Sequence, residues 1–196
     1  MKKFDFIIAL IIGELIALFS FGILKNLNLE TKLLYWIWPI FLPIFCAACL
    51  WFASVLATKI KFIWQLAKFV LVGVLNTVID IGVLNILIYL SGLASGTFYS
   101  AFKGLSFALS VVNSYFWNKH WTFGKKNEKS RKEFIQFFIV SLIGFAINVT
   151  SASLIVNIIG PQFGLSSTTW ANVGAIGAAF CGMTWNFLGY KFIVFK

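Results

Sequence analysis

Long, almost uncharged apolar segments are the feature that most constrains this chain. Crossing the hydrocarbon core of a bilayer takes about 20 residues of α-helix. Of the 196 residues, 60% are hydrophobic and only 11% are charged, whereas about a quarter of the residues of a soluble domain are charged. The sequence therefore predicts an all-α integral membrane protein. About six transmembrane helices are expected, near 5–24, 33–58, 66–90, 98–118, 134–159 and 168–190.

The distribution of Lys and Arg predicts the orientation of these helices. The connection at 119–133 contains five lysines and one arginine, whereas the connections at 91–97 and 160–167 contain neither residue type. Positively charged connections stay on the cytoplasmic side, so we expect both termini and the 119–133 connection to be cytoplasmic. The net charge of +10 comes from lysines between apolar runs rather than from one basic helical face, so no nucleic-acid partner is expected.

The aromatic residues near span ends and the cysteines both have simple interpretations in a membrane protein. An interfacial aromatic belt is expected near the span ends, formed by Trp36, Trp38, Trp64, Trp117, Trp121 and Tyr190. Three cysteines, Cys46, Cys49 and Cys181, lie inside apolar runs. We interpret them as packing residues rather than metal ligands or a redox pair, because the C-x-x-C motif has no polar neighbours.

The last two pairs of predicted spans look like copies of each other. KFVLVGVLNTVID (68–80) aligns without gaps with QFFIVSLIGFAIN (136–148). At the other end of each pair, YFWNKHWTF (115–123) aligns with FLGYKFIVF (187–195). Each copy has two spans and enters the membrane in the same direction, so the sequence predicts a parallel tandem repeat of two helical hairpins.

The repeat also predicts a division of the chain. Residues 1–65 show no relation to it and are expected to form an added transmembrane hairpin, while 66–196 form a four-helix domain. The alignment places Lys119 opposite Lys191. Both are expected at the cytoplasmic interface, where lysines attract lipid phosphates and aromatic residues anchor at headgroup level. For the aromatic residues, anchoring alone is an equally good interpretation.

Three charged residues lie away from the ends of predicted spans: Glu14, Asp80 and Lys103. An ionised side chain at mid-bilayer costs roughly 3 kcal/mol even on the more lenient insertion scale. Asp80 and Lys103 differ in depth by roughly 7 Å, which a lysine side chain can span, so we predict an ion pair. This pair either holds the hairpin together or keeps Lys103 available to an anionic headgroup. No partner is predicted for Glu14.

Polar residues recur at helical spacing in the last four spans. One such stripe comprises Lys103, Ser106, Ser110, Asn113 and Trp117. The candidate lipid- and sugar-binding residues are Asn76, Asp80, Lys103, Ser110, Asn113, Trp117, Asn118, Lys119, Asn148, Trp185, Asn186 and Lys191. No catalytic residue, metal site or cofactor is expected, because the sequence has no nucleotide-binding glycine loop and no carboxylate pair placed for acid–base chemistry.

The segments VGVLNTVIDIGV (72–83), NSYFWNKHWTF (113–123) and NFLGYKFIVF (186–195) resemble the GtrA-like family of small membrane proteins. The resemblance covers about 66–196. Family members typically have four spans, so the first two helices are a departure. In the second hairpin, Asn148 stands where the first has Asp80.

The resemblance implies translocation of a polyprenyl-phosphate-linked sugar across the bacterial cytoplasmic membrane, for glycosylation of cell-surface polysaccharide or teichoic acid. An alternative is an accessory subunit that anchors or stabilises a membrane glycosyltransferase, as the small subunit of dolichol-phosphate mannose synthase does. A bundle of four to six helices is narrow, and a path for the headgroup needs more surrounding protein than one copy provides. We therefore expect a homo-oligomer.

Overall fold

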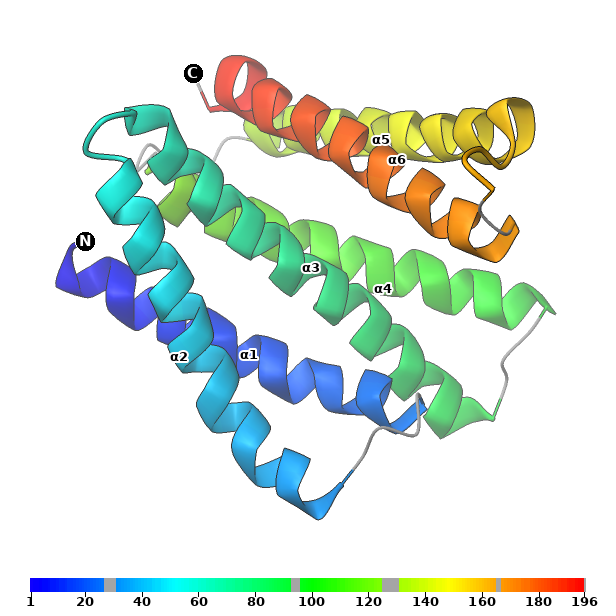
Figure 1. Cartoon of the computed structure of the whole chain (residues 1–196), viewed down its shortest axis with the longest axis horizontal. Helices are drawn as coiled ribbons and strands as arrows, with labels where there is room; N and C mark the ends of the chain where they lie inside the picture. Colours follow the sequence, from blue (N-terminus) through cyan, green and yellow to red (C-terminus); the bar gives the residue numbers. More distant parts are fainter. Residues whose placement is uncertain (27–30, 93–95, 125–130, 165–166, 196) are drawn as a thin grey trace. The chain divides into compact units, whose positions relative to one another are not determined.

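The computed structural model describes residues 1–26, 31–92, 96–124, 131–164 and 167–195, apart from some side chains inside the helices. These residues form six α-helices and no strand, as the sequence predicts (Figure 1). The helices are α1 (Lys3–Asn26), α2 (Lys32–Leu56), α3 (Lys61–Ser91), α4 (Gly96–Trp117), α5 (Arg131–Ser153) and α6 (Ser167–Gly189). Short π-helices continue three of them: η1 (Asn118–Thr122), η2 (Leu154–Ile159) and η3 (Tyr190–Val194).

Three segments of the described chain are long and apolar enough to cross a membrane: Lys3–Phe21, Lys32–Leu56 and Phe62–Ser91. Helix α3 has 31 residues and is therefore about 46 Å long. This length exceeds the roughly 30 Å of the hydrocarbon core. At least one end of α3 must therefore reach the headgroup region, unless the helix is strongly tilted.

The chain packs as two compact units, Met1–Gly124 and Lys125–Lys196. In the first unit, α1 packs against both α2 and α3, and α3 packs against α4. The N-terminal hairpin therefore shares a core with the first hairpin of the repeat. The predicted domains, 1–65 and 66–196, are a division by sequence relation rather than by packing, and they stay a prediction.

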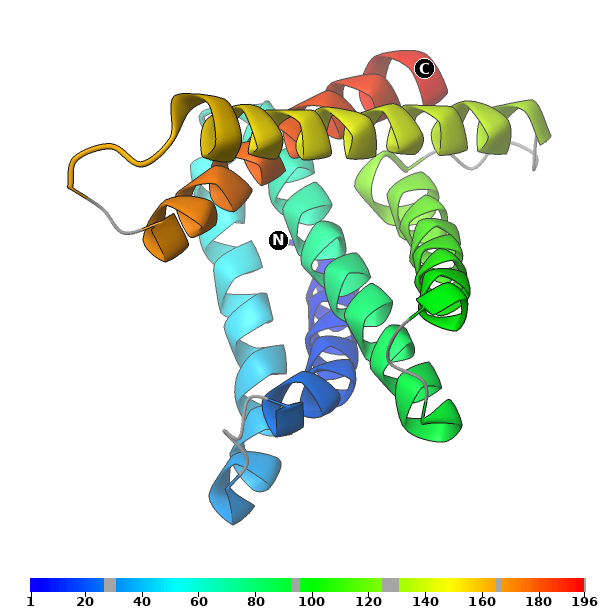
Figure 2. The same ribbon diagram turned by 90° about the vertical axis from the view of Figure 1, so that its right-hand side faces the viewer.

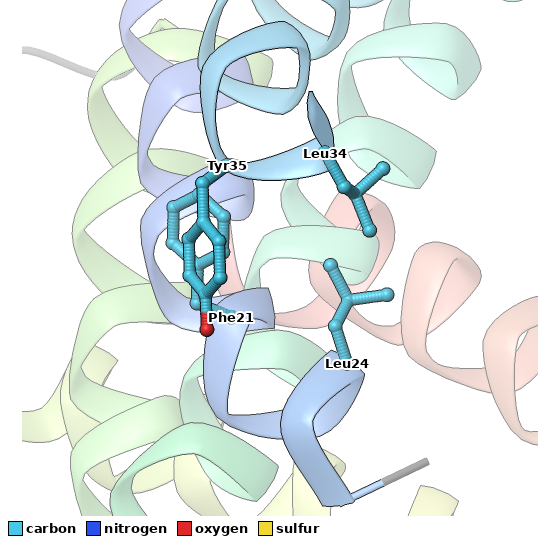
Figure 3. A pocket seen from close by; sticks show the side chains of 4 residues that line it. All are labelled: Phe21, Leu24, Leu34 and Tyr35. Carbon is cyan, nitrogen blue, oxygen red and sulfur yellow. The ribbon is translucent and has the colours of Figure 1, made fainter. Parts of the chain in front are cut away.

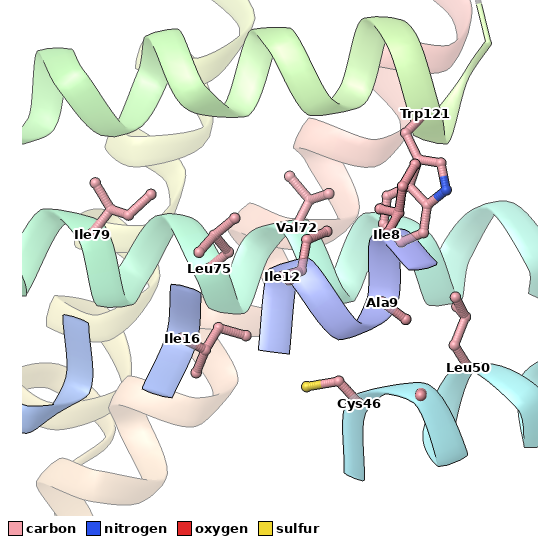
Figure 4. Packing of buried hydrophobic residues seen from close by; sticks show 11 residues of the cluster. Ile8, Ala9, Ile12, Ile16, Cys46, Leu50, Val72, Leu75, Ile79 and Trp121 are labelled. Carbon is pink, nitrogen blue, oxygen red and sulfur yellow. The ribbon is translucent and has the colours of Figure 1, made fainter. Parts of the chain in front are cut away.

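The core of the first unit is formed by one face of α1 against α2 and α3 (Figure 4). Apolar side chains at spacings of three and four residues supply it, because that spacing places them on one side of a helix. Its members are Ile8, Ala9, Ile12, Ile16, Cys46, Ala47, Leu50, Val72, Leu75, Ile79 and Trp121. Cys46 thus packs in the core, and both Cys46 and Cys49 are free thiols.

Helices α1 and α2 touch through their backbones at Gly13. A Cβ atom on Gly13 would lie 2.5 Å from Cα of Pro43 and 2.9 Å from the carbonyl oxygen of Leu42. Pro39 and Pro43 both lie inside α2, where each removes a backbone hydrogen bond and favours a bend. Since lipid tails are as apolar as the side chains, such close packing is a main source of helix association in membranes.

The second unit is an antiparallel hairpin of α5 and α6, which lie along each other (Figures 1 and 2). A Cβ atom on Gly182 of α6 would lie 3.0 Å from the carbonyl oxygen of Gly144 in α5. Near the end of the chain, the ring of Tyr190 stacks on Phe137 with 4.2 Å between centroids. Small residues and one aromatic stack therefore set the spacing of this hairpin.

The residues of the expected aromatic belt differ in exposure. Trp36 is 78% exposed, as a belt residue should be. Trp121 and Tyr190 are buried, so the prediction that they face the interface is wrong. Hydropathy cannot detect this, because a tryptophan or tyrosine near a span end can turn inward when another helix offers its N–H or O–H a partner.

Candidate functional site

A set of hydrogen-bonded polar side chains joins α3 to α4. The amide of Asn113 donates to Oδ1 of Asn76 at 2.6 Å, and Nε1 of Trp117 donates to Oδ1 of Asn113 at 3.1 Å. Closer to the α3–α4 connection, the Ser106 hydroxyl donates to Oδ1 of Asp80 at 2.6 Å. We call these five residues the α3–α4 polar seam. The structure therefore brings together four of the predicted site residues and adds Ser106.

Two further candidates in α4 behave differently. The Ser110 hydroxyl donates to the carbonyl oxygen of Phe107 at 2.8 Å, so its proton is used within its own helix. The side chain of Lys103 lies outside the part of the chain that the structure describes. The predicted Asp80–Lys103 ion pair therefore stays a prediction.

The first hairpin ends in η1, where the helix widens to π geometry. The backbone N–H of Phe123 donates to the carbonyl of Asn118 at 2.9 Å, and Nδ2 of Asn118 donates to the carbonyl of Ser114 at 2.9 Å. A side chain that donates to a backbone carbonyl of the preceding turn competes with the α-helical backbone hydrogen bonds and disturbs them. Such π segments are frequent at functional sites.

Lys119 points inward from η1 rather than outward. Lys119 is 1% exposed. Its Nζ lies 3.2 Å from the Tyr115 hydroxyl and 5.5 Å from the centre of the Tyr115 ring. Nearby, Oδ1 of Asn118 and Oγ1 of Thr122 are buried without a hydrogen-bond partner in the described structure. The expectation of a lysine open to headgroups thus does not fit Lys119 in this state.

The second hairpin ends in the same way, with different contacts. The backbone N–H of Phe195 donates to the carbonyl of Tyr190 at 2.8 Å, so η3 occupies the repeat positions of η1. Lys191 is half-buried, with its Nζ 5.8 Å from the centre of the Phe187 ring and 5.5 Å from that of Phe192. The two equivalent lysines therefore differ in exposure.

The remaining candidates pack inside the second hairpin. Nε1 of Trp185 donates to the carbonyl of Val140 at 3.1 Å. Asn186 fills the space left by the missing side chain of Gly144, and its Oδ1 is buried without a partner in the described structure. Asn148 packs beside Gly182. Among the described side chains of this hairpin, these three candidates do not form a hydrogen-bonded chain like the α3–α4 polar seam.

One buried polar cluster was missed by sequence reasoning. Asp5 of α1 forms a 2.5 Å ion pair with Lys68 of α3 and accepts a 2.9 Å hydrogen bond from Nε1 of Trp121 in η1. The Lys68 Nζ also lies 4.7 Å from the centre of the Trp64 ring. The available signal was a carboxylate inside the first turns of an apolar helix, which requires a cation nearby.

A shallow apolar pocket lies between the end of α1 and the start of α2 (Figure 3). It is lined by Phe21, Leu24, Leu34 and Tyr35, and the rings of Phe21 and Tyr35 stack with 5.1 Å between centroids. None of the predicted site residues lines it. Its lining is apolar, so it is not part of the candidate polar site.

Comparison with known proteins decides the family. The model of the GtrA/DPMS transmembrane domain matches residues 68–195. The chain belongs to this family. A relative from Bacillus subtilis (strain 168), named uncharacterized membrane protein YngA, is 33% identical over 140 residues, which cover 71% of this chain and 83% of the relative. No solved structure matches.

The family match confirms the resemblance and a multi-pass membrane location. As a GtrA/DPMS member, the chain is associated with the handling of polyprenyl-linked sugars. The matched segment begins at Lys68 and ends at Phe195, so it contains the α3–α4 polar seam, η1 and η3. Asp5 and the apolar pocket lie outside it. The N-terminal hairpin therefore contributes one side chain, Asp5, to a cluster whose cation is the first residue of the GtrA/DPMS domain.

Proposed function

We propose that this GtrA/DPMS protein translocates a polyprenyl-phosphate-linked sugar across the cytoplasmic membrane. The observation that carries the proposal is the α3–α4 polar seam, a file of amide, hydroxyl, carboxylate and indole groups along a membrane-spanning helix. Sugar hydroxyls require such donors and acceptors, and an indole ring offers a face for a pyranose. The prenyl chain can stay in lipid, so only the headgroup needs a polar path.

The strength of the seam is compatible with opening. Hydrogen bonds between membrane helices average about 0.6 kcal/mol, whereas leaving a buried polar group unpaired costs about 1–3 kcal/mol. A sugar hydroxyl that inserts between Asn76 and Asn113 would replace the bond that it breaks. The seam can therefore exchange partners with a headgroup at small net cost, while its polar groups stay paired.

Cations are available for the phosphate. Lys191 is half-buried among aromatic rings at the end of the second hairpin, and Lys103 is expected on the α4 stripe. Each lysine near an anionic headgroup contributes about 1 kcal/mol. We propose transport rather than catalysis, with movement driven by consumption of the lipid on the far side. In a homo-oligomer, helices of a second copy would also line the path of the headgroup.

The direct test is a vesicle assay with this chain as the only protein. A fluorescent polyprenyl-phosphate glucose is placed in both leaflets, and a membrane-impermeant reductant is added outside. A translocator makes almost all of the label reducible, whereas protein-free vesicles protect the inner half. A similarly labelled phosphatidylcholine should stay protected in both samples. Equal protection of the sugar lipid with and without protein would contradict the proposal.

A second function, from the class of interaction proteins, is an accessory subunit for a polyprenyl-phosphate glycosyltransferase. The observation in its favour is that Asn76, Asn113 and Trp117 satisfy one another, as residues that only hold two helices together would do. This alternative predicts co-purification with a membrane glycosyltransferase. It also predicts loss of transferase activity when the chain is absent, with no lipid movement in the vesicle assay.

A further inference from the structure

Asp5 occupies a site built from two different donors. A single carboxylate oxygen, Oδ1, lies 2.5 Å from Nζ of Lys68 and 2.9 Å from Nε1 of Trp121. The exposed fractions are 4% for Asp5, 7% for Lys68 and 4% for Trp121. The Lys68 Nζ lies 4.7 Å from the centre of the Trp64 ring and 5.1 Å from that of Trp121. One oxyanion thus sits between a cation and an indole N–H, beside two aromatic rings.

Stability alone is a weak reason for such an arrangement. Removing two charges from water costs several kcal/mol for each ion, and well-packed apolar residues often stabilise as much or more. The neighbouring core residues Ile8 and Val72 show that apolar packing is available here (Figure 4). A buried cation with an indole N–H and aromatic neighbours is, however, a strong anion site, because low local dielectric strengthens charge-assisted hydrogen bonds.

The cluster is formed by three helix ends of the first unit. Asp5 is in the first turn of α1, Lys68 is in the second turn of α3, and Trp121 follows α4 in η1. These three helix ends meet at one end of the first unit (Figure 1). The charge distribution predicts that this end is cytoplasmic. A phosphate at the cytoplasmic interface would therefore find this site before it meets the α3–α4 polar seam.

We propose that Lys68 and Trp121 form a binding site for a phosphate oxyanion, and that Asp5 of α1 fills it as an internal competitor. The carboxylate oxygen stands where a phosphate oxygen binds. When displaced, Asp5 remains in the first turn of α1, where the free backbone N–H groups favour a carboxylate. The ligand class is the phosphate of an anionic lipid, and its identification with a lipid-linked sugar rests on the proposed function.

The proposal predicts that one substitution, Asp5→Asn, increases the affinity for a phosphate ligand. Asp5→Asn keeps the shape and still accepts a hydrogen bond from Trp121, but it no longer competes as an anion. The full chain in phosphatidylcholine nanodiscs should bind radiolabelled farnesyl phosphate about tenfold more tightly with this change, which corresponds to a modest competitor. Lys68→Gln should abolish the binding. Unchanged or weaker binding by Asp5→Asn would overturn the site and leave Asp5 as a structural contact between α1 and α3.

A second variant keeps the test decisive if Asp5→Asn does not fold. The double change Asp5→Asn with Lys68→Gln leaves a neutral pair that can hydrogen-bond, so it should fold. It should also fail to bind farnesyl phosphate. Wild-type affinity in this folded double variant would overturn the proposal. Glu14→Gln, the same chemical change elsewhere in α1, is the matched control and should leave the affinity unchanged.

Two further arms identify the source of the phosphate and separate this inference from the proposed function. Farnesol should not bind, and inorganic phosphate should not displace farnesyl phosphate if the ligand is a lipid. Displacement by inorganic phosphate would keep the oxyanion site but assign it to free phosphate. If vesicles move the sugar lipid while Asp5→Asn gains no affinity, the inference alone fails. If the gain appears without movement, only the proposed function fails.

Discussion

The side-chain amide of Asn113 donates a 2.6 Å hydrogen bond to Oδ1 of Asn76 and so joins α4 to α3 within the GtrA/DPMS domain. The same Asn113 accepts from Trp117. Its removal therefore leaves two partners unpaired, whereas removal of Asn76 leaves one. Asn113→Ala should lower the free energy of unfolding by about 1–3 kcal/mol, and Asn76→Ala by less. Thermal unfolding in detergent measures both losses. An equal loss of stability in the two variants would contradict the chain of hydrogen bonds from Trp117 through Asn113 to Asn76.

An apolar replacement of the same pair separates the two proposed functions. Changing Asn76 and Asn113 together to Leu removes both partners, and such paired replacement is often nearly neutral for stability. For a translocator, this folded double variant should lose lipid movement in vesicles, because its polar path is interrupted. Cell-surface glycosylation that continues at the wild-type level in the double variant would favour the accessory subunit.

Contact between α1 and α2 predicts contrasting effects at two glycines. Gly13→Ala places a Cβ 2.5 Å from Cα of Pro43, so the helices must separate, and we expect the free energy of unfolding to fall by about 1–3 kcal/mol, as for an overpacked core. Gly73→Ala is the matched control, since nothing lies within 4 Å of its added Cβ. It should be neutral or stabilising by up to about 1 kcal/mol. Similar unfolding temperatures for both variants would refute the close approach.

The predicted Asp80–Lys103 ion pair is testable by a double-mutant cycle. Either Asp80→Asn or Lys103→Gln alone should cost several kcal/mol, because one buried charge loses its partner. The double variant should recover much of this loss. If Lys103→Gln alone is harmless, the hydrogen bond from Ser106 is the more important contact of Asp80, and Ser106→Ala should then be the costly change. Stability in detergent and lipid movement are measured for each.

The different exposure of Lys119 and Lys191 predicts different phenotypes. Lys191→Gln should weaken binding of the sugar lipid, with a larger effect at low salt, and should leave unfolding unchanged. Lys119→Gln should chiefly lower stability, because this lysine is buried beside Tyr115. Both are compared by lipid binding and by thermal unfolding. Loss of stability in Lys191→Gln alone would reverse the assignment.

Orientation is tested by cysteine labelling. In a variant with Cys46, Cys49 and Cys181 replaced by Ala, Asn127→Cys should react with an impermeant thiol reagent only after the membrane is opened. Ala94→Cys, in the lysine-free 91–97 connection, is the control and should react in intact cells. Labelling of Asn127→Cys in intact cells would contradict the cytoplasmic placement of the 119–133 connection.

The sequence alone predicted the helices and part of the α3–α4 polar seam. The span at 66–90 lies within α3, and Asn76, Asn113 and Trp117 were predicted as site residues from helical spacing. Such features depend on hydropathy and on the 3.6-residue period, which neighbouring residues determine. Membership of the GtrA/DPMS family likewise follows from motifs that can be read along the chain.

The tertiary structure decided which side chains meet across distant segments. Asp5 contacts Lys68 and Trp121 from 63 and 116 residues away in the chain, and no local pattern relates these positions. Lys119 shows the same limit: its charge and its place at a span end indicate an exposed residue, yet η1 turns it inward. Hydropathy and the helical period determine which segments form helices that lie in the membrane. Which way the end of a helix faces, and which side chains it contacts, depend on packing against the other helices.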